Sequence, residues 1–184
     1  RLHTADDRYS QWGIFVHSFN KLLPTAAHFD EHPEWFSMRD GRRVRDGQLC
    51  LSNPVVLDAL CQSLTETIAN DEDGHRGWSV SPNDNYNVCQ CLGCLRLDSL
   101  YGGPSGTLVN FVNQVARRFP DYTISTLAYQ YTRSAPKDFK VRPDSNVVIM
   151  LCPIEAGREE AISTSLKEAP FRNDLENWQL LTDN

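Results

Sequence analysis

Five short apolar runs along the chain are typical of β-strands, because they are rich in β-branched and aromatic residues and are bounded by polar or proline-containing segments. The runs are nearly continuous rather than alternating, as expected for strands that are covered on both faces of a sheet. They are residues 12–19, 47–53, 77–81, 122–131 and 146–155. We therefore expect five buried strands.

Three further segments carry apolar residues at helical spacing. In residues 53–70, Asn53 is the expected N-cap. The apolar positions of this segment are Val55, Leu57, Leu60, Leu64 and Ile68. In residues 105–120, Ser105 is a possible cap. One face of that segment carries Leu108, Phe111, Val112 and Val115. Residues 169–181 form the last predicted helix.

The alternation of strands and helices predicts an α/β fold with parallel pairing and right-handed crossovers. A doubly wound sheet and a TIM (β/α)8 barrel both fit this order. Polar residues at the C-terminal ends of the strands favour the barrel, where catalytic loops gather at that edge. They are His17, Asn53, Asn83, Asp84, Tyr129, Gln130, Tyr131 and Glu155. A whole barrel needs about 250 residues, so residues 1–184 are expected to be a fragment of one.

Composition narrows the class of protein. Hydrophobic residues make up 40% of the chain and charged residues 23%, as in an ordinary globular domain. The net charge of −6 argues against a nucleic-acid partner. No apolar run approaches the ~18 residues that a membrane span needs. The chain starts at Arg1 rather than Met, which suggests a processed or excised piece.

Six cysteines are present, and three of them stand in one C-x-C-x-x-C loop: Cys89, Cys91 and Cys94. Three interpretations remain open for this loop: a structural metal site, a disulfide or free thiols. Tetrahedral zinc takes four ligands, and either Cys50 or Cys152 could supply the fourth. Cys61 lies on the apolar side of the first predicted helix, where packing is its expected role.

Several stretches together resemble a known family: WGIFVHSF, HPEWFS, QLCLSNP, SVSPNDN, CQCLGC, SGTLVNFVN and LAYQYTR. The family is an uncharacterised bacterial group of glycoside-hydrolase-like proteins, often labelled alpha-glucuronidase-like. The match covers nearly the whole chain in order. It implies a larger parent with further barrel strands, and periplasmic or extracellular export of that parent is compatible with it. By analogy with such barrels, the SPNDN strand is about the fourth and the strand ending at Glu155 about the sixth.

The resemblance directs attention to two carboxylates, because glycoside hydrolysis uses a proton donor and a base or nucleophile on opposite sides of the scissile bond. Asp84 follows a predicted strand directly, and Glu155 follows a strand without other charges. The alternatives are a turn aspartate that bonds its own backbone and a surface glutamate. Which carboxylate would be the acid stays open.

Other polar and aromatic side chains at the same edge are candidates for binding a sugar. Tyrosine rings stack on sugar faces, amides can orient Asp84, and a guanidinium pairs with an acidic sugar. The candidates are His17, Asn83, Asn85, Tyr129, Gln130, Tyr131 and Arg133. Structural roles are the competing interpretation, namely a satisfied histidine, core aromatics and a surface ion pair for Arg133.

The leading hypothesis is a glycoside hydrolase fragment that acts on carbohydrate through Asp84 and Glu155, with no cofactor required for catalysis. The alternative is a non-catalytic carbohydrate-binding or structural α/β module with a cysteine-bound structural zinc. A third possibility is a metal-dependent hydrolase that uses His17 and Asp84. Because a partial barrel has open edges, its expected partners are the remaining barrel strands or a second copy of the chain.

Overall fold

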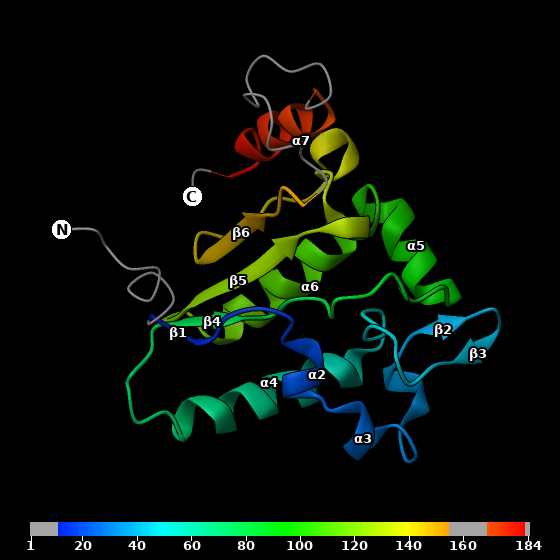
Figure 1. The fold of residues 1–184 in the computed structure, drawn as a ribbon, viewed down its shortest axis with the longest axis vertical. Helices are drawn as coiled ribbons and strands as arrows, with labels where there is room; N and C mark the ends of the chain where they lie inside the picture. Colours follow the sequence, from blue (N-terminus) through cyan, green and yellow to red (C-terminus); the bar gives the residue numbers. More distant parts are fainter. Residues whose placement is uncertain (1–10, 155–168, 183–184) are drawn as a thin grey trace.

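The computed structural model describes residues 11–154 and 169–182, and its centre is a parallel four-stranded sheet (Figure 1). The strands are β1 (Trp12–Ile14), β4 (Gly77–Ser79), β5 (Thr123–Ala128) and β6 (Val147–Leu151). Their order in the sheet is β1-β4-β5-β6, and every neighbouring pair is parallel. The predicted parallel α/β architecture is therefore confirmed.

Four longer helices accompany the sheet: α4 (Pro54–Ala69), α5 (Leu92–Tyr101), α6 (Pro104–Arg118) and α7 (Ala169–Gln179). In Figure 1, α6 lies behind β5 and α4 runs below β1 and β4, and both helices share the main core with the sheet. α7 packs at the β6 end through Trp178, together with Leu181 just after the helix. Two single-turn helices follow β1, namely α2 (Phe19–Leu22) and α3 (Thr25–His28). Within the described ranges, no helix is both long and apolar enough to cross a membrane.

The main core contains most of the apolar residues that the sequence predicts on helix faces. On α4, Leu57, Leu60 and Leu64 are buried, whereas Val55 is exposed. On α6, all four predicted positions are buried: Leu108, Phe111, Val112 and Val115. Cys61 packs in this core, as expected. The helical spacing of these residues therefore predicted the buried faces correctly, with one exception at the start of α4.

The two helix starts differ in their caps. Asn53 caps α4, because its Oδ1 accepts a hydrogen bond from the Val55 N–H at 3.0 Å. The prediction of Ser105 as the cap of α6 is wrong. This helix begins at Pro104, with Gly103 as the N-cap at a φ of 121° that a residue with a side chain rarely adopts. Ser105 is a buried residue of the first turn.

β1 and β4 fit together through two glycines, each facing a tryptophan of the other strand. An added Cβ at Gly13 would lie 2.2 Å from Cη2 of Trp78. An added Cβ at Gly77 would lie 2.7 Å from Cε3 of Trp12. Trp78 is almost completely buried. Glycine is needed at both positions because the indole rings occupy the space of a side chain.

Two of the predicted strands are corrected by the structure. The strand expected at residues 12–19 ends at Ile14, and Phe19 already begins α2. Residues 47–53 lie outside the sheet and touch Phe36 through one isolated antiparallel bridge at Leu49. Residues 47–50 are buried, which explains the apolar residues Leu49 and Cys50. Burial alone could not show whether their partner is the central sheet or a neighbouring loop.

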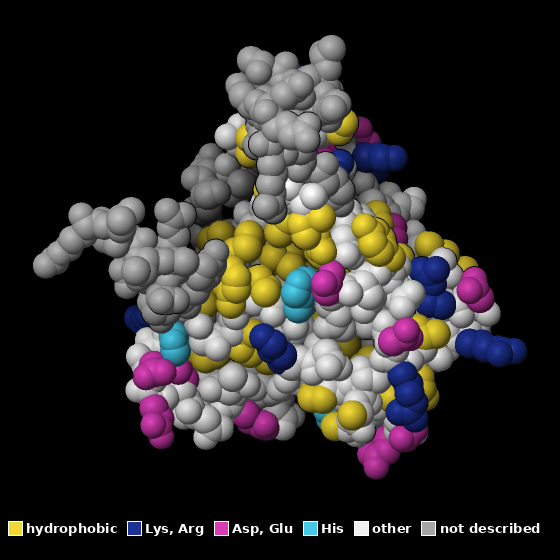
Figure 2. Space-filling view, in the orientation of Figure 1, with side chains coloured by type: hydrophobic (Ala, Val, Ile, Leu, Met, Phe, Trp, Pro, Cys, Tyr) yellow, Lys and Arg dark blue, Asp and Glu magenta, His cyan; other side chains and the backbone are white. Residues whose placement is uncertain are grey.

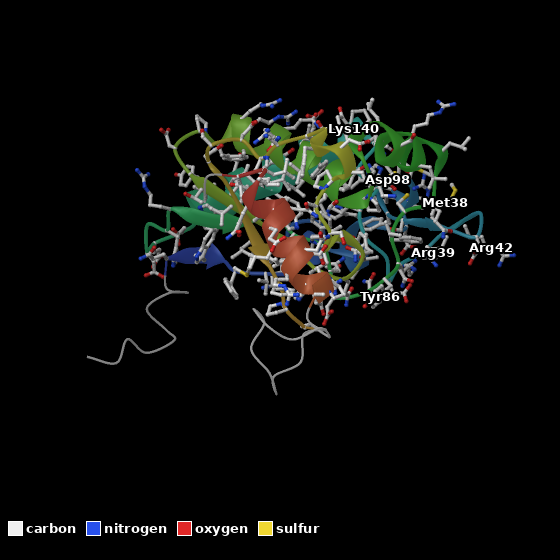
Figure 3. All side chains as sticks on the ribbon, turned by 90° about the horizontal axis from the view of Figure 1, so that it is seen from above. Met38, Arg39, Arg42, Tyr86, Asp98 and Lys140 are labelled. Carbon is white, nitrogen blue, oxygen red and sulfur yellow. The ribbon has the colours of Figure 1, made fainter. Side chains whose placement is uncertain are left out.

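The connection between β1 and α4 forms an arm that the sequence patterns did not predict. It contains the two-stranded antiparallel hairpin β2 (Met38–Arg39) and β3 (Arg42–Arg43). Figure 3 shows Arg39 and Arg42 on this projecting hairpin, with Tyr86 on the neighbouring loop. The guanidinium of Arg39 donates to the Tyr86 carbonyl at 3.3 Å, so arm and loop are in contact.

The face of the sheet opposite α4 and α6 is not covered by any described helix (Figure 1). Figure 2 shows apolar side chains gathered over the upper part of this face. Residues 148–151 of β6 are only half-buried. The described part of the chain thus leaves apolar sheet surface accessible.

Candidate functional site

The C-terminal ends of the parallel strands meet at one edge of the sheet, and a surface cavity of about 630 Å³ lies there. His17 follows β1 and Asp84 follows β4, and both line this cavity. Tyr129 and Gln130 follow β5 directly and contact Asp84. The complete lining is His17, Asn20, Thr25, Ala26, Arg45, Asp46, Gly47, Asn83, Asp84 and Asn85.

The carboxylate of Asp84 is held from one side only. Its Oδ1 accepts a hydrogen bond from the Tyr129 hydroxyl at 2.9 Å and another from the Gln130 side-chain amide at 3.1 Å. Among the described residues, Oδ2 makes no hydrogen bond, and the side chain is exposed. The carboxylate is therefore oriented by β5 while one oxygen remains available to a ligand.

Partial burial and the hydrogen bond to Asp84 raise the pKa of Tyr129 above its usual value. The hydroxyl therefore keeps its proton at neutral pH and continues to donate to the carboxylate. A fixed donor of this kind restricts the orientation of Asp84.

The loop that carries Asp84 is fixed by the buried side chain of Gln48. Its Oε1 accepts from the Asn83 N–H at 2.8 Å, and its Nε2 donates to the Asn83 and Asn85 carbonyls at 2.9 and 3.0 Å. Gln48 is 2% exposed, so these bonds are shielded from water. One amide thus holds the backbone on both sides of Asp84.

The imidazole of His17 also lines the cavity, and a hydrogen bond fixes its tautomer. Its Nδ1–H donates to the Pro82 carbonyl at 2.8 Å, which leaves Nε2 as the nitrogen that can accept from a ligand when the ring is neutral. Its ring lies 5.9 Å from the ring of Tyr129. The φ values of His17 and Gln130 are 51° and 50°, in the left-handed region. Such strain concentrates at functional sites.

The structure places the other predicted ligand-binding residues differently. Asn83 and Asn85 line the cavity, but their side-chain oxygens already accept hydrogen bonds from the Asn20 and Asn87 backbone N–H groups, respectively. Both asparagine side chains therefore have a structural role, because they bind backbone N–H groups.

Tyr131 and Arg133 lie away from this cavity. Tyr131 lines an interior cavity together with Cys94 and Asp98, and burial raises its pKa far above the usual value. The guanidinium of Arg133 pairs with the buried carboxylate of Asp174 on α7 at 2.7 Å. Glu155 lies outside the described residues, although β6 ends at the same edge of the sheet as β4 and β5.

A second cluster lies on the other side of the Asp84 loop, where four cysteine sulfur atoms are within 4.8 Å of one another. They belong to Cys50, Cys89, Cys91 and Cys94, and could bind a metal. The Sγ atom of Cys50 lies 3.6 Å from that of Cys91 and 3.9 Å from that of Cys94. All six cysteines of the chain are free thiols in this structure.

The close packing of the four thiols shifts the pKa values of three of them. Hydrogen bonds from the thiols of Cys89 and Cys94 hold the pKa of Cys50 well below its usual range. The hydrogen bond to Cys50 in turn raises the pKa values of Cys89 and Cys94. A bound metal ion would allow several thiolates to form together.

Sequence reasoning missed two groups of residues at these sites. Gln48 is an uncharged residue in a segment that looks like a strand, and only its position in the fold reveals its contacts. Asn20, Arg45 and Asp46 come from α2 and from the loop after the hairpin, which strand-end patterns do not point to. Cys50 was one of two candidates for the fourth sulfur, and the structure brings Cys50 rather than Cys152 to the cluster.

One protein family matches the sequence. A family profile with the description "Domain of unknown function (DUF4838)" matches residues 1–184. No curated protein and no solved structure matched the chain.

Proposed function

Because this chain belongs to the DUF4838 family, described as a domain of unknown function, we propose a function from the geometry of the Asp84 edge: binding and hydrolysis of a carbohydrate. The observation that carries this proposal is the Asp84 carboxylate itself. It stands at the C-terminal edge of parallel strands, with one oxygen held by Tyr129 and Gln130 and the other facing no described partner.

The surroundings of Asp84 suit a sugar. Sugars present many hydroxyl groups, which pair with amides, imidazoles and carboxylates, and their flat faces stack on aromatic rings. The cavity combines His17, Asn20 and Asp46 with Asp84, and Tyr86 is exposed beside it on the same loop. Arg45 also lines the cavity, where its guanidinium pairs with the carboxylate of Asp30 and lies 4.6 Å from the centre of the Phe29 ring.

The fold supports the same proposal. We take the four strands to be successive units of a (β/α)8 barrel, because they pair in chain order and α4 and α6 cover one face. The uncovered apolar face and the open edges at β1 and β6 would then meet the remaining strands of a longer parent or a second copy. In such a barrel Glu155 would supply the second carboxylate.

A hydrolysis assay with a panel of aryl glycosides, including glucuronides, tests the catalytic part. The longest natural chain that carries this domain should be compared with its Asp84→Asn variant and with Asp121→Asn as a control at an exposed aspartate. We expect a loss of at least about 100-fold in kcat for Asp84→Asn, the usual scale for removing an acid–base group, and no change for the control. Full activity of Asp84→Asn would exclude Asp84 as a catalytic carboxylate.

A second candidate function is a non-catalytic carbohydrate-binding or structural module stabilised by zinc. The four clustered sulfurs favour it, because sites rich in thiolate are usually closed and structural. Sugar binding that depends on Asp84 without hydrolysis of any glycoside would support this candidate over the hydrolase.

A further inference from the structure

The sulfur positions match the geometry of a particular metal site. Zinc–sulfur bonds of about 2.3 Å in a tetrahedron place neighbouring sulfurs about 3.8 Å apart. Cys50 lies 3.6 Å from Cys91 and 3.9 Å from Cys94, and all four sulfurs are within 4.8 Å of one another. Sulfurs of a disulfide are only about 2.05 Å apart. The arrangement therefore fits a tetrathiolate better than a bridge.

The groups around the sulfurs also suit thiolates. Backbone N–H groups of Met38 and Cys94 point at Cys89 and Cys91, at 3.3 and 3.4 Å. The Arg43 guanidinium lies 3.9 Å from the Cys89 sulfur. A zinc ion with four thiolates carries a net charge of −2, and these donors would offset part of it.

Ser52 closes one side of the cluster. Its hydroxyl lies within 3.5 Å of the sulfurs of Cys50, Cys91 and Cys94. Cys50, Cys89 and Cys94 are all less than 5% exposed. A site with four sulfurs and little access for water has no open position for a substrate, so its role would be structural.

The four cysteines come from two segments that are also joined by hydrogen bonds and by packing. Cys50 stands two residues after Gln48, and Cys89 stands five residues after Asp84. The side chain of Gln48 links the two segments by hydrogen bonds to the Asn83 and Asn85 backbone. A metal shared by both segments would therefore fix the loop that presents Asp84.

We propose that Cys50 completes a tetrathiolate zinc site with Cys89, Cys91 and Cys94, and that this zinc clasps residues 47–52 to the Asp84 loop at residues 82–94. The inference rests on the structural zinc that belongs to the second candidate function. It adds the fourth ligand and a defined task for the metal. It does not depend on hydrolysis.

Metal analysis of the purified chain tests the ligand set. The chain should contain one zinc per molecule, Cys50→Ser should lose it, and Cys152→Ser should keep it as a matched control. Cobalt loaded in place of zinc should give the strong visible bands of a tetrahedral thiolate site. Stepwise modification of the wild-type thiols with a mercurial should release zinc as the clustered thiols react, which needs no variant that folds.

Hydrogen exchange of the wild-type chain with and without a chelator tests the clasp. Zinc removal should speed amide exchange at residues 47–52 and 82–94 by at least tenfold, while β5 stays protected. Each contrary result has its own meaning. A wild-type chain without metal, with the four clustered thiols reactive, overturns the zinc itself. Zinc retained in Cys50→Ser overturns the fourth ligand, and unchanged exchange after zinc loss overturns the clasp.

Discussion

Replacing Gln48 by Met tests how the Asp84 loop is held. Methionine has nearly the same length as glutamine but cannot donate or accept as an amide does. The amide of Gln48 makes three hydrogen bonds at a time, because Oε1 accepts from the Asn83 N–H and the two hydrogens of Nε2 serve the Asn83 and Asn85 acceptors. At about 1 kcal/mol for each net bond, the variant should lose about 3 kcal/mol of stability. For a chain of this size, that corresponds to a fall in Tm of roughly 6–12 °C.

Thermal unfolding followed by circular dichroism measures this change, and Gln62→Met is the matched control. Gln62 is exposed on α4, and within the described part of the chain its side chain bonds only to Glu66, so its replacement should change stability by less than about 0.5 kcal/mol. If the loop opens only locally, amide hydrogen exchange at residues 83–88 will become faster while the Tm changes little. Equal melting of the two variants, with unchanged exchange in the loop, would refute the assigned role of Gln48.

Three smaller tests address the fold and the electrostatics. Gly13→Ala should lower the free energy of unfolding by urea by about 1–3 kcal/mol, because the new Cβ would lie 2.2 Å from the Trp78 ring. This loss should be smaller in a Trp78→Phe background. An equal loss in both backgrounds would contradict the contact. In Asp84→Asn, the pKa of Tyr129 should move down toward its usual value, since the carboxylate contributes to raising it; phenolate absorbance measured against Tyr129→Phe in each background checks this, and an unchanged pKa would speak against the contact. Asn53→Ala should lower the free energy of unfolding by about 1 kcal/mol through loss of the helix cap, and an unaltered urea midpoint would show that the cap does not matter.

The parts of the fold that the sequence predicts are those in which local pattern and final burial agree. The buried face of α6 and the Asn53 cap follow from spacing and side-chain chemistry within a few residues. Polar residues after strands also led to His17 and Asp84, and the structure brings both to one cavity because parallel strands end at the same edge.

The missing parts depend on contacts between distant segments. Leu49 and Cys50 are apolar because their segment is buried against residues 35–37 and the Asp84 loop, not because it joins the sheet. The helix α5 begins inside the cysteine loop, where Cys91 serves as its N-cap by accepting from the Cys94 N–H. The C-x-C-x-x-C spacing predicts a metal site or a disulfide, and it does not indicate that a helix begins there.

The central claim is that a carbohydrate binds at the edge that carries Asp84. Its most direct test is a titration of the ¹⁵N-labelled chain with neutral and acidic oligosaccharides, followed by amide chemical shifts. We expect at least one sugar to shift the amide signals of residues 17–20, 45–47, 83–87 and 129–131. We also expect Asp84→Asn to weaken this binding. Shifts confined to another surface, or no shift with any sugar at millimolar concentration, would contradict it.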